Sequence, residues 1–161
     1  MDWLQFWELL SYLVTVFGLP FAIAVFIYEQ RRERNGDDEE AYQVLANAYT
    51  DFLKVVLAHS DLRLRSAERC TDLTPEQLER RRVIYDMLIS LFERAYLLAY
   101  EEDMSPTEAR RWNSWEDYMR EWCRRADFAS VLPDLLRGED EEFAAYIRRL
   151  ESEERAKLAA R

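Results

Sequence analysis

A run of twenty uncharged residues from Leu9 to Tyr28, LLSYLVTVFGLPFAIAVFIY, constrains this chain more than any other feature of its sequence. At about 1.5 Å of rise per residue, a helix of this length covers the roughly 30 Å hydrocarbon core of a bilayer. A helix buried in a soluble domain rarely stays apolar on every side over such a length. The run therefore predicts a membrane-spanning helix.

The residues around this run favour a retained anchor over a cleaved secretory signal. Signal peptides begin with basic residues and end at a small-residue cleavage site. Here the acidic residues Asp2 and Glu8 precede the run, and no pair of small residues with that spacing follows it. We therefore expect residues 1–30 to form a transmembrane anchor, with Trp3 and Trp7 in its outer aromatic flank.

The orientation of the anchor follows from its arginines. Arg31, Arg32 and Arg34 follow the run directly, and no lysine or arginine precedes it. Cytoplasmic flanks of membrane helices carry the excess of positive charge. We expect an inner (plasma) membrane location with the N-terminus outside, and a basic juncture at residues 31–36 whose arginines contact lipid headgroups. The remaining chain is then cytoplasmic.

The composition of this remainder predicts one acidic helical domain at 37–150, followed by a charged tail at 151–161. The whole chain has a net charge of −10, which disfavours nucleic acid as a partner because phosphate binding needs clustered positive charge. Three glycines and four prolines leave few turns for β-hairpins. The expected fold class is all-α: one N-terminal transmembrane helix followed by a cytoplasmic bundle of about four or five helices.

Two capping boxes predict where helices of this domain begin. Thr74-Pro75-Glu76-Gln77 and Ser105-Pro106-Thr107-Glu108 each combine a hydroxyl cap, a proline at the first helical position and a Gln or Glu three residues after the cap. Between them, apolar residues from Val83 to Tyr100 cover nearly every face, which is typical of a helix at the centre of a bundle. Asp86 and Glu93 interrupt this stretch, and pairing with neighbouring arginines, Arg82 and Arg94, is the simplest explanation for them.

Other helix boundaries follow from spacing and from turn residues. An apolar stripe with steps of three and four predicts a helix that ends near His59, and its members are Tyr42, Leu45, Tyr49, Phe52, Leu53, Val56 and Leu57. Leu132-Pro133 is expected to break a helix or to begin a short one, and Gly138 to end it. A last helix is expected from about Asp140, with Phe143, Ile147 and Leu150 facing inward and the tail from Glu151 fraying.

A stripe of tryptophans has three possible roles. Trp112, Trp115, Met119, Trp122 and Ala126 recur at steps of three and four among several arginines. Trp112, Trp115 and Trp122 are candidates for docking a protein partner, because tryptophan and arginine concentrate binding energy at interfaces. The same residues could lie on the inner leaflet, or they could be core residues with the arginines on the solvent side.

The apolar run carries a stripe of small residues. Ser11, Thr15, Gly18 and Ala22 lie at i, i+4, i+7 and i+11, on one face of the expected helix. Small side chains allow membrane helices to approach closely. This face is the candidate surface for packing against another span, either a copy of the same helix or that of a partner. In an oligomer, Ser11 and Thr15 could line the outer mouth of a channel.

No catalytic or metal-binding pattern emerges. The single histidine, His59, has Val56 three residues before it, so the Glu-x-x-His motif of di-iron bundles is missing, and we expect a structural or exposed role for it. Cys70 and Cys123 are too few for a disulfide framework and are expected to be free thiols. We expect no cofactor and no metal, and we expect the protein not to be an enzyme.

Three segments carry a resemblance to a family. They are Tyr49-Thr50-Asp51-Phe52-Leu53, Leu91-Phe92-Glu93-Arg94-Ala95-Tyr96 and Trp112-Asn113-Ser114-Trp115-Glu116-Asp117-Tyr118. With them, the chain resembles an uncharacterised group of bacterial single-pass membrane proteins that have an N-terminal helix and a cytoplasmic helical domain. The resemblance implies this architecture and a bacterial origin, and no activity comes with it.

The leading expectation for function is a membrane-tethered, non-catalytic interaction or scaffold protein. It would present its acidic helical domain at the inner leaflet, with membrane lipid and a protein partner as its contacts. Tethering raises the effective concentration of partners confined to one surface. The alternative is a homo-oligomeric assembly or channel packed through the Ser11, Thr15, Gly18 and Ala22 face. A weaker alternative is a sensor or enzyme subunit that needs a partner.

The small-residue face yields a testable prediction. Replacing Gly18 and Ala22 together with leucine should weaken association of the membrane helix, because the bulky side chains would keep a second helix from close approach. A genetic or fluorescence-transfer assay of dimerisation in membranes measures this effect. Unchanged assembly would show that helix packing does not use this face.

Overall fold

The computed structural model describes residues 25–26, 39–66 and 72–160. Over these ranges the chain contains helices and no strands, so the predicted all-α class is confirmed. Most of the predicted membrane run lies outside the described residues, with the exception of Val25 and Phe26, which are helical. Within the described ranges, no helix combines the length and the apolar character that crossing a membrane requires.

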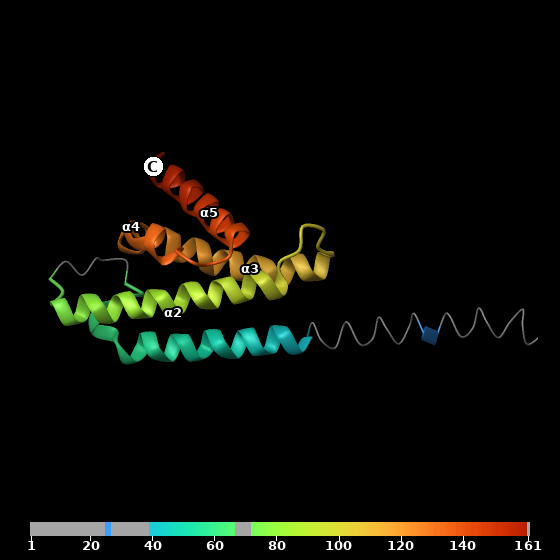
Figure 1. Ribbon diagram of the computed structural model, residues 1–161, viewed down its shortest axis with the longest axis horizontal. Helices are drawn as coiled ribbons and strands as arrows, with labels where there is room; N and C mark the ends of the chain where they lie inside the picture. The colour runs from blue at the N-terminus through green and yellow to red at the C-terminus, as the bar shows by residue number, and fades with distance from the viewer. Residues whose placement is uncertain (1–24, 27–38, 67–71, 161) are drawn as a thin grey trace, which may run out of the picture. The chain divides into compact units, whose positions relative to one another are not determined.

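The chain divides into two compact units, Met1–Glu40 and Ala41–Arg161. The second unit is a helical bundle. Figure 1 shows α2 through its middle, with helical residues up to 58 along one side and the later helices along the other. We refer to the first described helix of this bundle as helix 39–58, and it is followed by η1 (Ser60–Leu62), α2 (Pro75–Ala99), α3 (Pro106–Cys123), α4 (Ala126–Leu135) and α5 (Glu141–Ala159).

Both predicted capping boxes are present at the starts of α2 and α3. The hydroxyl of Thr74 accepts a hydrogen bond from the Gln77 backbone N–H at 3.2 Å, and the Gln77 side chain accepts one from the Thr74 N–H at 2.9 Å. In the same way, the Ser105 hydroxyl accepts from the Glu108 backbone N–H at 3.4 Å, and the Glu108 carboxylate accepts from the Ser105 N–H at 2.7 Å. Each pair satisfies two backbone donors that a helix start leaves without partners, which explains why both helices begin at their prolines.

Helix 39–58 buries four of the seven residues of the predicted apolar stripe, and Tyr42 and Leu53 are half-buried. Its buried residues are Leu45, Tyr49, Phe52 and Val56. Leu57 was predicted to face the core but is 77% exposed. It directly follows Val56, and successive helical residues point about 100° apart, so the two cannot share one narrow face.

α2 is the central helix, as predicted, but its surroundings cover only part of its circumference. The residues that it buries are Ile84, Tyr85, Leu88, Ile89, Leu91, Phe92, Ala95 and Tyr96. One side of the helix carries apolar residues that remain exposed. There the apolar side chains of Val83, Met87, Leu97 and Leu98 are between 44% and 59% exposed.

The boundary between α3 and α4 differs from the expectation. Ala126 was predicted to continue the tryptophan stripe on one helix, but α3 ends at Cys123 and Ala126 begins α4. Arg125 between them has an extended backbone, which turns the chain. Pro133 was expected to break or begin a helix and instead lies in the last turn of α4.

The C-terminal part of the chain is more ordered than the sequence suggests. Gly138 has a φ of +91°, a left-handed conformation that suits glycine, and it ends the turn after α4. The Asp140 carboxylate then caps α5 by accepting from the Phe143 N–H at 2.9 Å. The charged tail expected to fray from Glu151 is helical as far as Ala159 and belongs to α5.

Candidate functional site

The three tryptophans proposed for docking lie inside the bundle. Trp112, Trp115 and Trp122 are only 3%, 3% and 1% exposed. The Trp115 ring meets Tyr49 edge-on at 5.6 Å between centroids, and the Trp122 ring meets Phe52 at 5.9 Å. The docking and lipid-facing roles are therefore corrected: these indoles are core residues. Trp115 and Trp122 pack α3 against helix 39–58, whereas the Trp112 ring meets Tyr96 of α2 and Tyr146 of α5.

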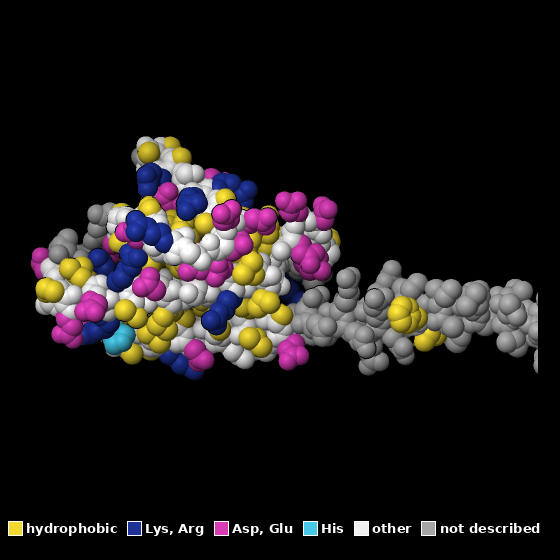
Figure 2. Space-filling model, viewed as in Figure 1, with side chains coloured by type: hydrophobic (Ala, Val, Ile, Leu, Met, Phe, Trp, Pro, Cys, Tyr) yellow, Lys and Arg dark blue, Asp and Glu magenta, His cyan; other side chains and the backbone are white. Residues whose placement is uncertain are grey.

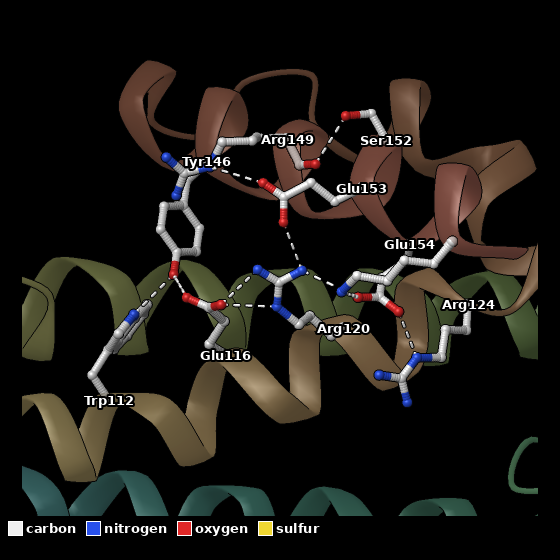
Figure 3. A network of polar contacts seen from close by, with 10 residues as sticks. Trp112, Glu116, Arg120, Arg124, Tyr146, Arg149, Ser152, Glu153 and Glu154 are labelled. Carbon is white, nitrogen blue, oxygen red and sulfur yellow. Dashed lines mark hydrogen bonds and ion pairs between the residues drawn. The ribbon is translucent and has the colours of Figure 1, made fainter. Parts of the chain in front are cut away.

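Glu116 and Arg120 on one face of α3 form a polar network with α5 (Figure 3). The Tyr146 hydroxyl accepts a hydrogen bond from Trp112 Nε1 at 2.9 Å and donates one to the Glu116 carboxylate. Glu116 also accepts from Arg120 Nε at 2.8 Å, and the Arg149 guanidinium lies 4.8 Å above the Tyr146 ring. Burial raises the pKa of Tyr146, and its bond to a carboxylate raises that pKa further, so the phenol stays protonated.

The network continues to a buried carboxylate. Glu154 on α5 is 2% exposed and accepts hydrogen bonds from Arg120 at 3.1 Å, Arg124 at 2.7 Å and Lys157 at 2.6 Å. Burial alone would raise the pKa of this carboxyl, but its three cationic partners outweigh that effect and lower the pKa to about 2. Glu154 is therefore charged at neutral pH and links α5 to the solvent-facing edge of α3.

Glu154 was not expected from the sequence as a site residue, because it lies in a segment predicted to fray. A usable signal was present, since Phe143, Ile147, Leu150 and Glu154 continue one stripe at steps of four, three and four. An acidic residue on a buried stripe requires a cationic partner. Two arginines four residues apart, one on α3 and one just after its end, supply it, although only the fold reveals that α3 is the helix opposite.

A second carboxyl cluster joins α2 to the loop before α5. Glu139 lies close to Glu93, and Glu93 accepts from the Asp140 backbone N–H at 2.6 Å. Burial, together with the nearby charges of Glu93 and Asp86, raises the pKa of Glu139 to about 7. The predicted pairing of Asp86 with Arg82 is present at 3.4 Å, whereas Glu93 caps the loop instead of binding an arginine.

The other candidate residues offer little reactive chemistry. His59 is half-exposed at the end of helix 39–58, where its carbonyl oxygen accepts from the Leu62 N–H at 3.0 Å. Cys123 is a buried free thiol, and burial raises its pKa to about 12, so it is not a nucleophile at neutral pH. Within the described ranges, no three histidine, cysteine or carboxylate side chains come together as a metal site requires.

A pocket of about 470 Å³ lies beside the junction of α3 and α4. Arg65, Arg124 and Arg125 line it with Trp122 and Leu158. Each arginine already pairs with a carboxylate of the described chain, at 3.0, 2.7 and 2.7 Å respectively. The pocket therefore offers an anion no uncompensated positive charge from the described residues.

An apolar groove lies between helix 39–58 and α2. Its volume is about 640 Å³. Figure 2 shows hydrophobic side chains gathered along the face that these two helices form. The groove is lined by Ala48, Asp51, Phe52, Val55, Val83, Asp86, Met87, Ser90, Leu91 and Arg94. A groove of this kind, apolar at its base with charges at its edges, suits an amphipathic helix.

The remaining sequence-predicted site residues fall outside the described ranges. They are Ser11, Thr15, Gly18 and Ala22 on the small-residue face, and Arg31, Arg32 and Arg34 at the predicted lipid headgroup juncture. Their roles stay predictions from the sequence. Comparisons of this chain with protein-family models, with curated proteins and with solved structures found no match. The resemblance to bacterial single-pass proteins therefore also stays an expectation.

The buried carboxylate makes Glu154→Gln a sharp test of the α3–α5 network. We expect the variant to lose about 2–4 kcal/mol of unfolding free energy at pH 7, because Arg120 and Arg124 lose their buried counter-charge. A group with a lowered pKa stabilises the fold above its unfolded pKa. The difference from wild type should therefore shrink as pH falls from about 4.5 through about 2.

Denaturant unfolding followed by circular dichroism measures this difference. Glu142→Gln on the same helix is the matched control, since Glu142 is exposed and its replacement should cost about 1 kcal/mol or less. Equal losses for the two variants would contradict the assigned role of Glu154.

The Glu93–Glu139 pair predicts the opposite pH dependence. Because the pKa of Glu139 is raised to about 7, its contribution to stability is complete below about pH 4.5 and is lost as pH rises through 7. The free energy of unfolding of Glu139→Gln should equal that of wild type near pH 5 and should exceed it by about 1–2 kcal/mol at pH 8. Thermal unfolding at both pH values tests this, with the exposed neighbour variant Glu141→Gln expected to show no such pH dependence.

Proposed function

We propose that this chain is a membrane-tethered, non-catalytic interaction module whose helical domain binds a protein partner at the inner leaflet. The observation that carries the proposal is the apolar groove between helix 39–58 and α2. Apolar patches on a charged surface commonly mark binding sites for proteins. The tether would be the uncharged run from Leu9 to Tyr28, of which Val25 and Phe26 are helical and 39% and 65% exposed.

Several properties of the bundle support a binding role over a catalytic one. The buried polar groups of Tyr146 and Glu154 are used in cross-helix bonds. The buried thiol of the bundle is held protonated. By contrast, Val83 and Met87 in the groove remain 52% and 44% exposed, although neighbouring positions on the same helix are fully buried. Exposed apolar area beside a rigid core is typical of a surface that a partner covers.

The tether and the groove require separate measurements. For the tether, the full chain should stay in the membrane pellet after washing with high salt and then with alkaline buffer, which remove peripheral proteins. Release by either wash would contradict the tether. The N-terminal side should be reached by membrane-impermeant reagents from outside the cell, in agreement with the predicted orientation.

For the groove, the full chain is extracted gently and the mass of its complex is determined, with every co-purifying chain identified. We expect a stoichiometric complex that Met87→Glu dissociates, because the substitution places a charge on the apolar surface. Leu158→Glu on α5 is the matched control: Leu158 is 49% exposed and lies outside the groove. A single chain without any partner, or a complex that Met87→Glu leaves intact, would contradict the binding role.

A further inference from the structure

The open face of α2 has an unusual order of side chains. Ser90 lies at its middle, with Asp86 four residues before it and Arg94 four residues after it. Val83 and Leu97 follow at seven residues on either side. These five positions recur at helical spacing and share the side of α2 that the bundle leaves uncovered.

These residues are available for contact. Val83 and Leu97 are 52% and 59% exposed, and Ser90 is half-buried between them. Asp86 makes one exposed contact to Arg82 at 3.4 Å, which contributes little to stability. The described chain places no carboxylate within ion-pair distance of Arg94. The opposite charges of Asp86 and Arg94 therefore lie on either side of Ser90 and do not pair with each other.

We propose that a second copy of this chain covers this face, with α2 packed antiparallel against α2 of the partner subunit about a two-fold axis at Ser90. The inference rests on the function proposed above and names the occupant of the same surface. Residues equally far from a two-fold axis face each other across it. Asp86 then meets Arg94 of the partner subunit, Val83 meets Leu97 of the partner subunit, and the symmetry repeats both contacts.

The charges select the antiparallel arrangement. In a parallel pair, Asp86 would face Asp86 of the partner subunit, and Arg94 would face its own copy. Like charges held together at an interface are unfavourable, and two such pairs would form. In the antiparallel pair both ion pairs are attractive. The small side chain of Ser90 allows the helices to approach closely at the axis, and the contact from Val83 to Leu97 extends over about 21 Å of helix.

The groove widens this contact. Met87 lies on the side of α2 that faces helix 39–58. It lines the groove together with Ala48 and Val55 of helix 39–58. An antiparallel α2 of the partner subunit therefore touches both α2 and helix 39–58 of the first chain, and apolar residues of the groove lie beside the Asp86–Arg94 pairs. A different protein would require no symmetric order of charges on α2, whereas a second copy does.

Cysteine cross-linking tests the position of the axis. Ser90→Cys in the full chain should give a covalent dimer under mild oxidation, because the two Cα atoms would lie within the roughly 7 Å that a disulfide spans. Wild type, which keeps its native cysteines, and Ser152→Cys on the exposed side of α5 are the controls. No more dimer from Ser90→Cys than from these controls would overturn the proposal.

A charge exchange tests the pairing. D86R and R94D should each lower the association constant of the dimer about tenfold or more, and the double variant D86R/R94D should recover most of the loss. R148D, at an exposed position on α5, makes the same charge change as R94D and should leave association unchanged. Absence of recovery in the double variant would overturn the antiparallel pairing, and circular dichroism of each variant verifies that it is folded.

The mass of the native complex separates this inference from the function on which it rests. A complex of two copies that is weakened by D86R and by Met87→Glu supports both the proposed function and the second copy as occupant of the groove. One copy bound to a different protein, lost with Met87→Glu, leaves the proposed function standing and overturns the second copy as occupant. A dimer that responds to Gly18 and Ala22 substitutions and not to D86R places self-association in the membrane helix and overturns the α2 pairing. A single chain alone overturns both proposals.

Discussion

The bundle depends on one buried charge and the cations around it. A carboxylate as enclosed as that of Glu154 is unfavourable by several kcal/mol unless it is paired. Arg120 and Arg124 approach it from α3, and Lys157 approaches it from the next turn of α5. These contacts determine which face of α5 meets α3 and how far along the helix the two are aligned. The burial of the tryptophans of α3 depends on that alignment.

The two carboxyl clusters of the bundle respond to pH in opposite ways because their neighbours differ. Cations surround Glu154, so its charged form is favoured in the fold. Glu139 faces Glu93 and lies near Asp86, so its protonated form is favoured. One cluster joins α5 to α3, and the other joins the start of α5 to α2. The position of α5 is therefore set at two points whose stabilities change in opposite directions as pH rises.

The sequence predicted the parts of the fold that depend on local chemistry. The capping boxes at Thr74 and Ser105 involve residues three apart, so their outcome needs no knowledge of the rest of the chain. The central place of α2 was also predictable from its apolar content. The exposure of its outer side was not, because a hydrophobic position shows that burial is favourable and does not show which partner provides it. Glu154 was missed for the same reason, since its partners lie on another helix.

The buried thiol of Cys123 has a consequence for the chemistry of the whole chain. It lies at the end of α3, is 4% exposed, and is close enough to α5 for the charges of Glu151 and Glu154 to raise its pKa. Oxidants and electrophiles attack the exposed thiolate, and this site supplies neither exposure nor thiolate. Because carboxylates of α5 lie near this thiol, separation of α5 from α3 would open a path for reagent to the sulfur. The rate at which Cys123 becomes modified therefore records how often the bundle opens at its C-terminal helix.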